Sequence, residues 1–92
     1  MSDPTPRRQR LTRVAAQQVE ADRLLSTATH STMRGQVRLA SRDLNEALLW
    51  LNETDVDAGS SILKIVDLLL DLAIWRLTLV DSNLKTYGPG PS

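Results

Sequence analysis

The sequence contains no cysteine and no phenylalanine, and its 92 residues include only two tryptophans, one tyrosine and one histidine. Without cysteine the chain can form neither a disulfide framework nor a thiolate metal site, which suits a reducing compartment. His30 is the only imidazole, so we also expect no metal centre. The scarcity of aromatic rings disfavours binding of single-stranded nucleic acid by base stacking.

Sequence motifs of catalysis are also lacking. The four glycines lie too far apart to form a phosphate-binding loop or a dinucleotide-binding turn, and there is no nucleophile elbow or zinc-ligand spacing. Asp67 and Asp71 lie one helical turn apart, but no histidine or third acid accompanies them at the spacing of a bundle metal site. We therefore expect no enzymatic activity, no cofactor and no small-molecule substrate.

Neither a secretory signal nor a membrane span is expected. The start, "MSDPTPRRQR", lacks the apolar stretch that follows the basic residues of a signal peptide, which predicts a cytoplasmic protein. Residues 62–80 are long enough to cross a bilayer but include four charged residues. Each would cost roughly 2.5 to 3.5 kcal/mol at the bilayer centre.

The net charge of zero conceals a division between the two halves of the chain. Residues 1–42 carry eight arginines and three acids, a net charge of +5, whereas residues 43–92 carry three bases and eight acids, a net charge of −5. This asymmetry indicates a basic arm for nucleic acid or an acidic protein, or two halves that lie against each other.

The pattern predicts an all-α fold. Apart from Gly35 and Gly59, glycine and proline lie near the chain ends, and no segment alternates polar and apolar residues convincingly. We expect three helices, at about 6–28, 32–52 and 57–86, that form a bundle. They make one domain over residues 1–92, with short flexible ends at about 1–5 and 88–92.

Helix boundaries and inward faces follow from capping residues and from the helical period. The expected start signals are Thr5 before Pro6, then Ser31 or Thr32, then the capping box of Thr54 and Asp57, and Gly88 ends the third helix. The first helix has a thin apolar stripe of Leu11, Val14, Ala21, Leu25 and Ala28, which Gln18 interrupts. The second has a clean seam of Met33, Val37, Ala40, Leu44, Ala47 or Leu48, and Leu51.

The third helix carries more apolar surface than its own chain can cover. In "ILKIVDLLLDLAIWRLTLV", residues 62–80, fourteen of nineteen residues are apolar, and its polar positions gather into one strip of about 120°. Two neighbouring helices cover only about half of a helix circumference, so the surplus predicts a homo-oligomer, most simply a two-fold dimer with a shared core. The expected interface residues are Ile65, Leu69, Leu72, Arg76 and Leu79.

Arg76 lies at the centre of this apolar arc. If the arc is buried, the guanidinium requires a carboxylate or carbonyl partner, because an unpaired buried charge costs several kcal/mol. We expect that partner to come from another subunit or from this set of acids: Glu20, Asp22, Asp43 and Glu46. The alternative is that the aliphatic stem follows the apolar arc and leaves the charge at its rim.

Two further groups of residues are candidates for binding. Trp50, Trp75 and Leu39 lie off the helix seams and are plausible anchors for a protein partner. Arg34, Arg38 and Arg42 form a row that suits phosphates or acidic protein surfaces, or a solvated face. Near the chain start, the residues that could bind nucleic acid are Arg7, Arg8, Arg10 and Arg13.

These features predict a non-enzymatic protein–protein interaction module, a small homo-oligomeric accessory, regulatory, adaptor or assembly protein that binds itself and another protein. The alternative prediction is a nucleic-acid-binding regulator that binds DNA through its arginine-rich first half. The two differ in the salt dependence of duplex DNA binding.

Overall fold

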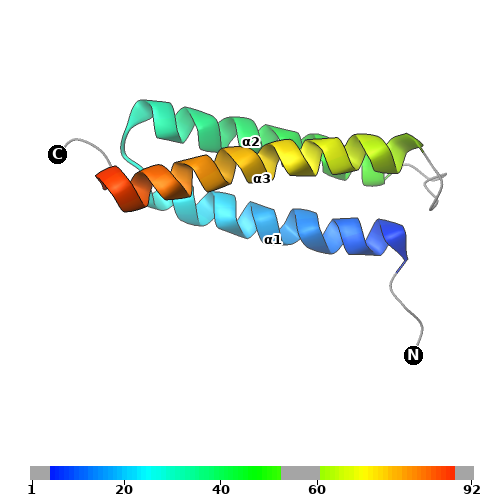
Figure 1. Cartoon of the computed structure of the whole chain (residues 1–92). Helices are drawn as coiled ribbons and strands as arrows, with labels where there is room; N and C mark the ends of the chain where they lie inside the picture. The colour runs from blue at the N-terminus through cyan, green and yellow to red at the C-terminus, as the bar shows by residue number, and fades with distance from the viewer. Residues whose placement is uncertain (1–4, 53–60, 89–92) are drawn as a thin grey trace.

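The computed structural model describes residues 5–52 and 61–88, and this part of the chain folds into three helices without strands. Helix α1 spans Pro6–Thr27, α2 spans Ser31–Leu51 and α3 spans Ser61–Tyr87. The three helices lie roughly along one axis; α1 and α3 run in the same direction and α2 runs in the opposite one (Figure 1). The predicted all-α bundle is confirmed, with helix bounds close to those expected.

The helix ends confirm some capping predictions and correct one. The Thr5 hydroxyl accepts a hydrogen bond from the backbone N–H of Arg8 at 3.1 Å, with proline in the first turn, as predicted. At α2 the cap is His30, whose Nδ1 accepts from the N–H of Thr32 at 3.2 Å. Ser31 or Thr32 was the wrong choice because the helix begins at Ser31, and only the preceding residue has the extended backbone of a cap.

Gly88 ends α3 as predicted. Its φ of +78° lies in the left-handed region, and its N–H bonds to the carbonyl of Leu84 at 2.9 Å. The expected capping box of Thr54 and Asp57, the start of the third helix before Ser61, and most of both terminal segments lie outside the described residues.

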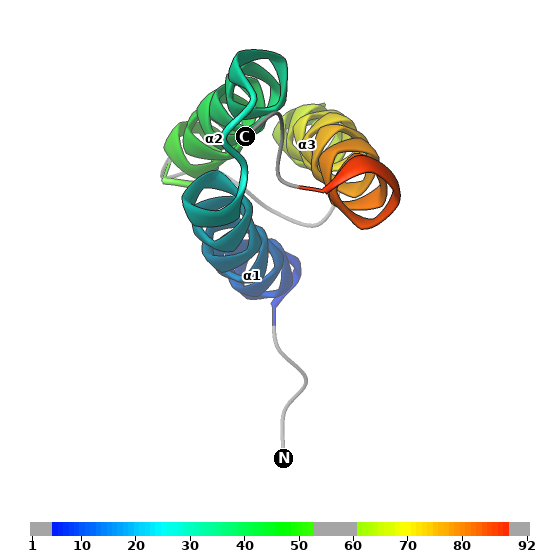
Figure 2. The ribbon, with the colours of Figure 1, turned by 90° about the vertical axis from the view of Figure 1, so that its left-hand side faces the viewer.

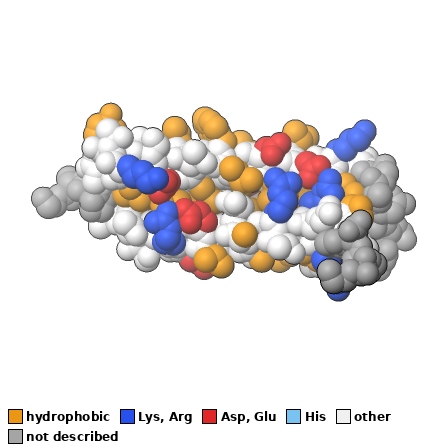
Figure 3. Space-filling view, turned by 60° about the horizontal axis from the view of Figure 1, so that its bottom comes forward, with side chains coloured by type: hydrophobic (Ala, Val, Ile, Leu, Met, Phe, Trp, Pro, Cys, Tyr) orange, Lys and Arg blue, Asp and Glu red, His pale blue; other side chains and the backbone are white. Residues whose placement is uncertain are grey.

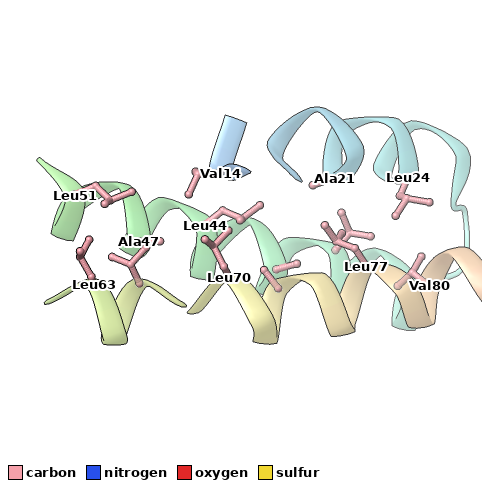
Figure 4. Packing of buried hydrophobic residues seen from close by; sticks show 14 residues of the cluster. Val14, Ala21, Leu24, Leu44, Ala47, Leu51, Leu63, Leu70, Leu77 and Val80 are labelled. Carbon is pink, nitrogen blue, oxygen red and sulfur yellow. The ribbon is translucent and has the colours of Figure 1, made fainter. Parts of the chain in front are cut away.

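The core lies between the three helices (Figure 4). From α2 it takes the predicted seam, Val37, Ala40, Leu44, Ala47 and Leu51, all fully buried. From α3 it takes Leu63, Val66, Leu70, Ala73, Leu77 and Val80. From α1 the fully or almost fully buried residues are Val14, Ala21 and Leu24. Leu24 therefore has the central position that the helical period assigned to Leu25, which is only partly buried.

Helices α2 and α3 form the larger contact, and α1 packs against one side of this pair (Figure 2). Polar contacts supplement the thin apolar stripe of α1: the Gln18 amide donates to Asn45 Oδ1 of α2 at 3.3 Å. Within the described residues, no helix combines the length and apolar character needed to cross a membrane.

Candidate functional site

Helix α3 has a second apolar row that faces away from the core. Four of its side chains are exposed although large and apolar: Leu68 (70%), Leu72 (40%), Trp75 (58%) and Leu79 (42%). The half-buried Ile65 extends the row by three residues toward the helix start. We call these five residues the outer seam. Their spacing alternates between three and four residues, so they share one face of the helix.

Helix α2 adds two exposed apolar side chains beside this seam. Leu39, which is 41% exposed, lies three residues after Gln36 and four before Asp43. Gln36 and Asp43 both contact Arg76 of α3, which fixes this strip of α2 along the α3 boundary. Trp50, 38% exposed, lies two turns beyond Asp43 on the same strip. The outer seam, Leu39 and Trp50 together form what we call the α2–α3 outer face.

Arg76 is the charged group at the centre of this face. Its Nε lies 3.3 Å from Asp43 Oδ2, and its Nη1 donates to Gln36 Oε1 at 2.9 Å. The side chains of Arg76 and Asp43 are only 21% and 16% exposed. Asp43 is one of the four acids predicted as partners, so the expected pairing is confirmed within one subunit.

The Arg76–Asp43 contact is an ion pair without a hydrogen bond. Nε of Arg76 and Oδ2 of Asp43 are buried atoms that have no hydrogen-bond partner, because the two groups are misaligned at 3.3 Å. Leu72 and Leu79 lie one turn before and one turn after Arg76, on either side of this pair. The Arg76–Asp43 ion pair is therefore flanked by the exposed apolar side chains of Leu72 and Leu79.

Three of the seven arginines in the predicted phosphate-binding groups bind elsewhere within the chain. The Arg7 Nε donates to the carbonyl of Leu51 at the end of α2, at 2.6 Å. The Arg34 Nη1 donates to carbonyls at the end of α1, those of Leu25 and Ala28, at 2.7 and 3.0 Å. These guanidiniums stabilise the last turns of neighbouring helices, where carbonyl groups lack helical partners.

The third, Arg10, joins α1 to α3. Its Nε and Nη2 donate to both carboxylate oxygens of Asp67, each at 3.0 Å, which raises the pKa of the guanidinium through hydrogen bonding. The four remaining arginines of the two groups are exposed and form no ion pair with a described residue: Arg8, Arg13, Arg38 and Arg42. Three of the seven arginines are thus engaged within the chain, and the four that remain are divided between α1 and α2.

A second ionic cluster joins α1 to α3 near the other end of the bundle. Arg23 of α1 binds Glu20 and, at 3.0 Å, Asp81 of α3. Lys85 also binds Asp81 at 3.0 Å. Hydrogen bonds from Lys85 and Arg23 lower the pKa of the Asp81 carboxyl, and the hydrogen bond from Arg23 lowers that of Glu20. Acidic and basic side chains accordingly lie together on this side of the molecule (Figure 3).

Two surface hollows are lined by residues that the structure describes. One, of about 260 Å³ between α1 and α2, is lined by Gln18, Asp22, Ser41 and Asn45. Another, of about 450 Å³ along α1, is lined by Arg8, Gln9, Thr12 and Arg13. Ser41 and Asp22 line the first hollow but form no hydrogen bond with each other, so the serine hydroxyl is not paired with a base there. The described residues contain no cluster of three metal-ligating side chains.

Comparison with known proteins adds no relative. No protein-family model matches the chain, and neither a curated protein nor a solved structure matches it.

The outer seam regroups residues that the sequence assigned to separate sites. Leu72 and Leu79 were predicted at a subunit interface and Trp75 at a partner site, and all three lie on one face. Leu68 was missed although it is among the most exposed residues of that face. Its position three residues after Ile65 and four before Leu72 was the available signal.

Proposed function

We propose that this protein is a non-enzymatic interaction module that self-associates through its α2–α3 outer face and acts as a small accessory or assembly protein. The observation that carries the proposal is the row of exposed large apolar side chains on α3, continued by Leu39 and Trp50 of α2. Contiguous apolar surface of this kind marks interaction sites in proteins. A cysteine-free chain suits the reducing cytoplasm, which is the compartment we propose.

The exposed apolar surface is large enough to matter energetically. Complete burial of a Leu or Trp-sized side chain stabilises by about 1.5 to 3 kcal/mol, and the four most exposed seam residues retain roughly half of that each. Their burial would contribute on the order of 3 to 6 kcal/mol before the entropic cost of association. A two-fold contact buries these residues on both subunits, which doubles the sum to about 6 to 12 kcal/mol. A dissociation constant of 10 to 100 μM corresponds to about 5.5 to 7 kcal/mol, so we expect a dimer in this concentration range.

A second copy of the chain is the occupant that we propose. A two-fold contact places the same patch on both subunits, so each apolar residue needs only another apolar residue opposite it. The α2–α3 outer face satisfies this because its exposed side chains are apolar apart from Glu46, which lies between Asp43 and Trp50 on α2, and its central charges, Arg76 and Asp43, have opposite signs. Trp50 and Leu39 lie at the α2 edge of this face, beside the α3 seam, and are the residues that a further protein would bind.

Light scattering coupled to size-exclusion chromatography tests the proposal. We expect the wild-type chain at about 10 to 100 μM to have twice the mass of one subunit, or more. The double variant Leu68→Lys/Trp75→Lys should have the mass of a single subunit, because two ammonium groups cannot be buried in an apolar interface without partners.

The matched control is Val19→Lys/Leu49→Lys. Val19 and Leu49 are 70% and 69% exposed, comparable with Leu68 and Trp75, but lie outside the α2–α3 outer face. This control should associate as the wild type does, and both variants should retain helical circular dichroism. A folded wild-type chain that stays a single subunit at 100 μM would refute the proposal, as would equal loss of association in both double variants.

A further inference from the structure

We infer that two copies of α3 pair in parallel along the outer seam, with Asp71 of each subunit facing the partner's Arg76. This inference rests on the proposed self-association and specifies its geometry. It assigns Asp71, which forms no ion pair with a described residue, a role as the acid that determines the direction of pairing.

The spacing of the outer seam is that of a coiled coil. Ile65, Leu72 and Leu79 repeat every seven residues, and Leu68 and Trp75 lie between them at the second apolar position of the same repeat. An alternation of three and four residues keeps an apolar seam facing one other helix that supercoils around it. The seam is therefore suited to a single helix of similar length and repeat, and α3 of a second copy has both.

In a parallel coiled coil, isoleucine at the first repeat position and leucine at the second favour two strands over three or four. Ile65 and Leu68 follow this rule in the first repeat. The core ridge of α3 lies on a different side of the helix, because Leu70 and Leu77 are fully or almost fully buried while four of the five seam residues are exposed. Pairing through the seam thus leaves the three-helix core of each subunit intact.

The charges that flank the seam discriminate between the two possible directions. In a parallel pair, a residue that precedes the first repeat position lies near the residue five positions later on the partner helix. Asp71 precedes Leu72, and the residue five positions later is Arg76. The two-fold axis makes this contact twice, between groups of opposite charge.

An antiparallel pair gives poorer contacts. The register that matches Leu68 with the partner's Leu79, and Leu72 with the partner's Trp75, also covers all four exposed seam residues. It places residues of the same flank opposite each other, however, so Asp71 is separated from the partner's Arg76 by the width of the helix. The same register brings Lys64 alongside the partner's Lys85, which is repulsive.

Arg76 has the donors needed for this second contact. A guanidinium presents five N–H groups in a planar fork. One nitrogen donates to Gln36 and another lies against Asp43 within the same subunit. A carboxylate arriving from the partner would add a charge-assisted hydrogen bond to a half-buried cation that at present has an ion pair without one.

Single cysteine variants of the otherwise cysteine-free chain test the direction of pairing. In the parallel arrangement, Leu68→Cys lies beside its own copy at a Cα–Cα distance of about 6 Å, within the range of a disulfide. In the antiparallel register the two copies are eleven residues apart along the axis, about 16 Å. We expect Leu68→Cys, and separately Leu79→Cys, to form a covalent dimer under mild oxidation by oxidised glutathione, detected as intact mass.

Leu49→Cys is the matched control because Leu49 and Leu68 are equally exposed, at 69% and 70%. It should remain a single chain under the same oxidation. If neither Leu68→Cys nor Leu79→Cys forms a disulfide alone but a mixture of the two does, the pairing is antiparallel and the inference is wrong. A dimer in light scattering that no seam cysteine links also refutes it, yet leaves the proposed function standing; a single-copy protein refutes both.

Charge reversal of Asp71 gives an independent readout. In the parallel dimer, Asp71→Arg places a second arginine beside the partner's Arg76 at both symmetry-related contacts. We therefore expect the dissociation constant of the dimer to rise by about tenfold at low salt. The control is Asp22→Arg, which makes the same change of net charge at an exposed acid of α1. Equal dissociation constants for the two variants would contradict the proposed Asp71 contact.

Discussion

Asp43 compensates the charge of Arg76 among apolar side chains, and its removal should be felt by the whole fold. The two side chains are about one-fifth exposed, so the guanidinium would lose its counter-charge while remaining largely shielded from water. Breaking a fully buried ion pair costs about 3 to 5 kcal/mol, and partial exposure reduces that cost. We expect Asp43→Ala to lower the free energy of unfolding by about 1 to 3 kcal/mol, measured by urea denaturation at fixed protein concentration.

Glu46→Ala is the control, because Glu46 lies one turn further along α2, is exposed and forms no ion pair with a described residue. It should change stability by less than about 0.5 kcal/mol. The double variant Asp43→Leu/Arg76→Met should regain most of the loss, since replacing both charges by apolar groups leaves neither unpaired. Equal changes in the free energy of unfolding for Asp43→Ala and Glu46→Ala would show that the Arg76 guanidinium is solvated by water and does not depend on Asp43.

At the scale of the element, α1 depends on charge more than α2 and α3 do. Its buried side chains are few, whereas two ionic contacts, Arg10–Asp67 and Arg23–Asp81, link it to α3. Exposed or half-exposed ion pairs are individually weak and respond to salt and acid. Helix α1 is therefore the element whose attachment should change first with pH.

Acid should loosen α1 before the rest of the bundle. The pKa values of Glu20 and Asp81 are lowered in the folded chain, so these carboxylates stabilise it above their ordinary values near 4, and the stabilisation is lost as the pH falls through the lowered values. We expect hydrogen exchange, corrected for intrinsic rates, to show selective loss of protection in α1 between pH 6 and pH 3.

The variant Asp67→Asn/Asp81→Asn provides the comparison for this acid effect. It removes both acids of α3 that bind arginines of α1, so α1 should already be less protected at pH 6 and should change little on acidification. If α2 and α3 lose protection at the same pH as α1, the carboxylates act on the global stability of the bundle and the element-specific account fails.

The helices themselves follow from local sequence, whereas the contacts between them do so only in part. The seam of α2 was predictable because every fourth or third residue is apolar between Val37 and Leu51. For α1 the period could not distinguish Leu24 from Leu25, since both are leucines next to each other and the choice depends on how the helix rotates against α2 and α3.

The α2–α3 outer face was predictable as surplus apolar surface but not as a defined patch. Residues on α3 were apolar over most of its circumference, so the sequence could not tell the core ridge at Leu70 from the outer seam at Leu72. Only the rotation of α3 against α2, reported by the contacts of Arg76 with Gln36 and Asp43, separates the two. The sequence could not indicate individual hydrogen-bond partners, such as the Leu51 carbonyl for Arg7, because these depend on how the helices pack in three dimensions.

At the scale of the whole molecule, the basic first half and the acidic second half lie against each other in part. Arginines of α1 contact acids of α3 at both ionic clusters. The division of charge along the sequence is therefore partly neutralised within the fold. The exposed arginines that remain are divided between α1 and α2: Arg8, Arg13, Arg38 and Arg42.

Duplex DNA should consequently bind weakly and without a steep dependence on salt. A protein that contacts six to ten phosphates loses about 10³- to 10⁵-fold in affinity between 50 and 200 mM salt. With Arg7, Arg10 and Arg34 engaged within the chain, fewer contacts are available, and we expect fluorescence anisotropy of a labelled duplex to show no saturable binding below about 100 μM protein at 50 mM salt. Saturable binding that weakens a thousandfold by 200 mM salt would favour a nucleic-acid-binding regulator, and Arg8→Glu/Arg13→Glu should then abolish it while leaving the oligomeric mass unchanged.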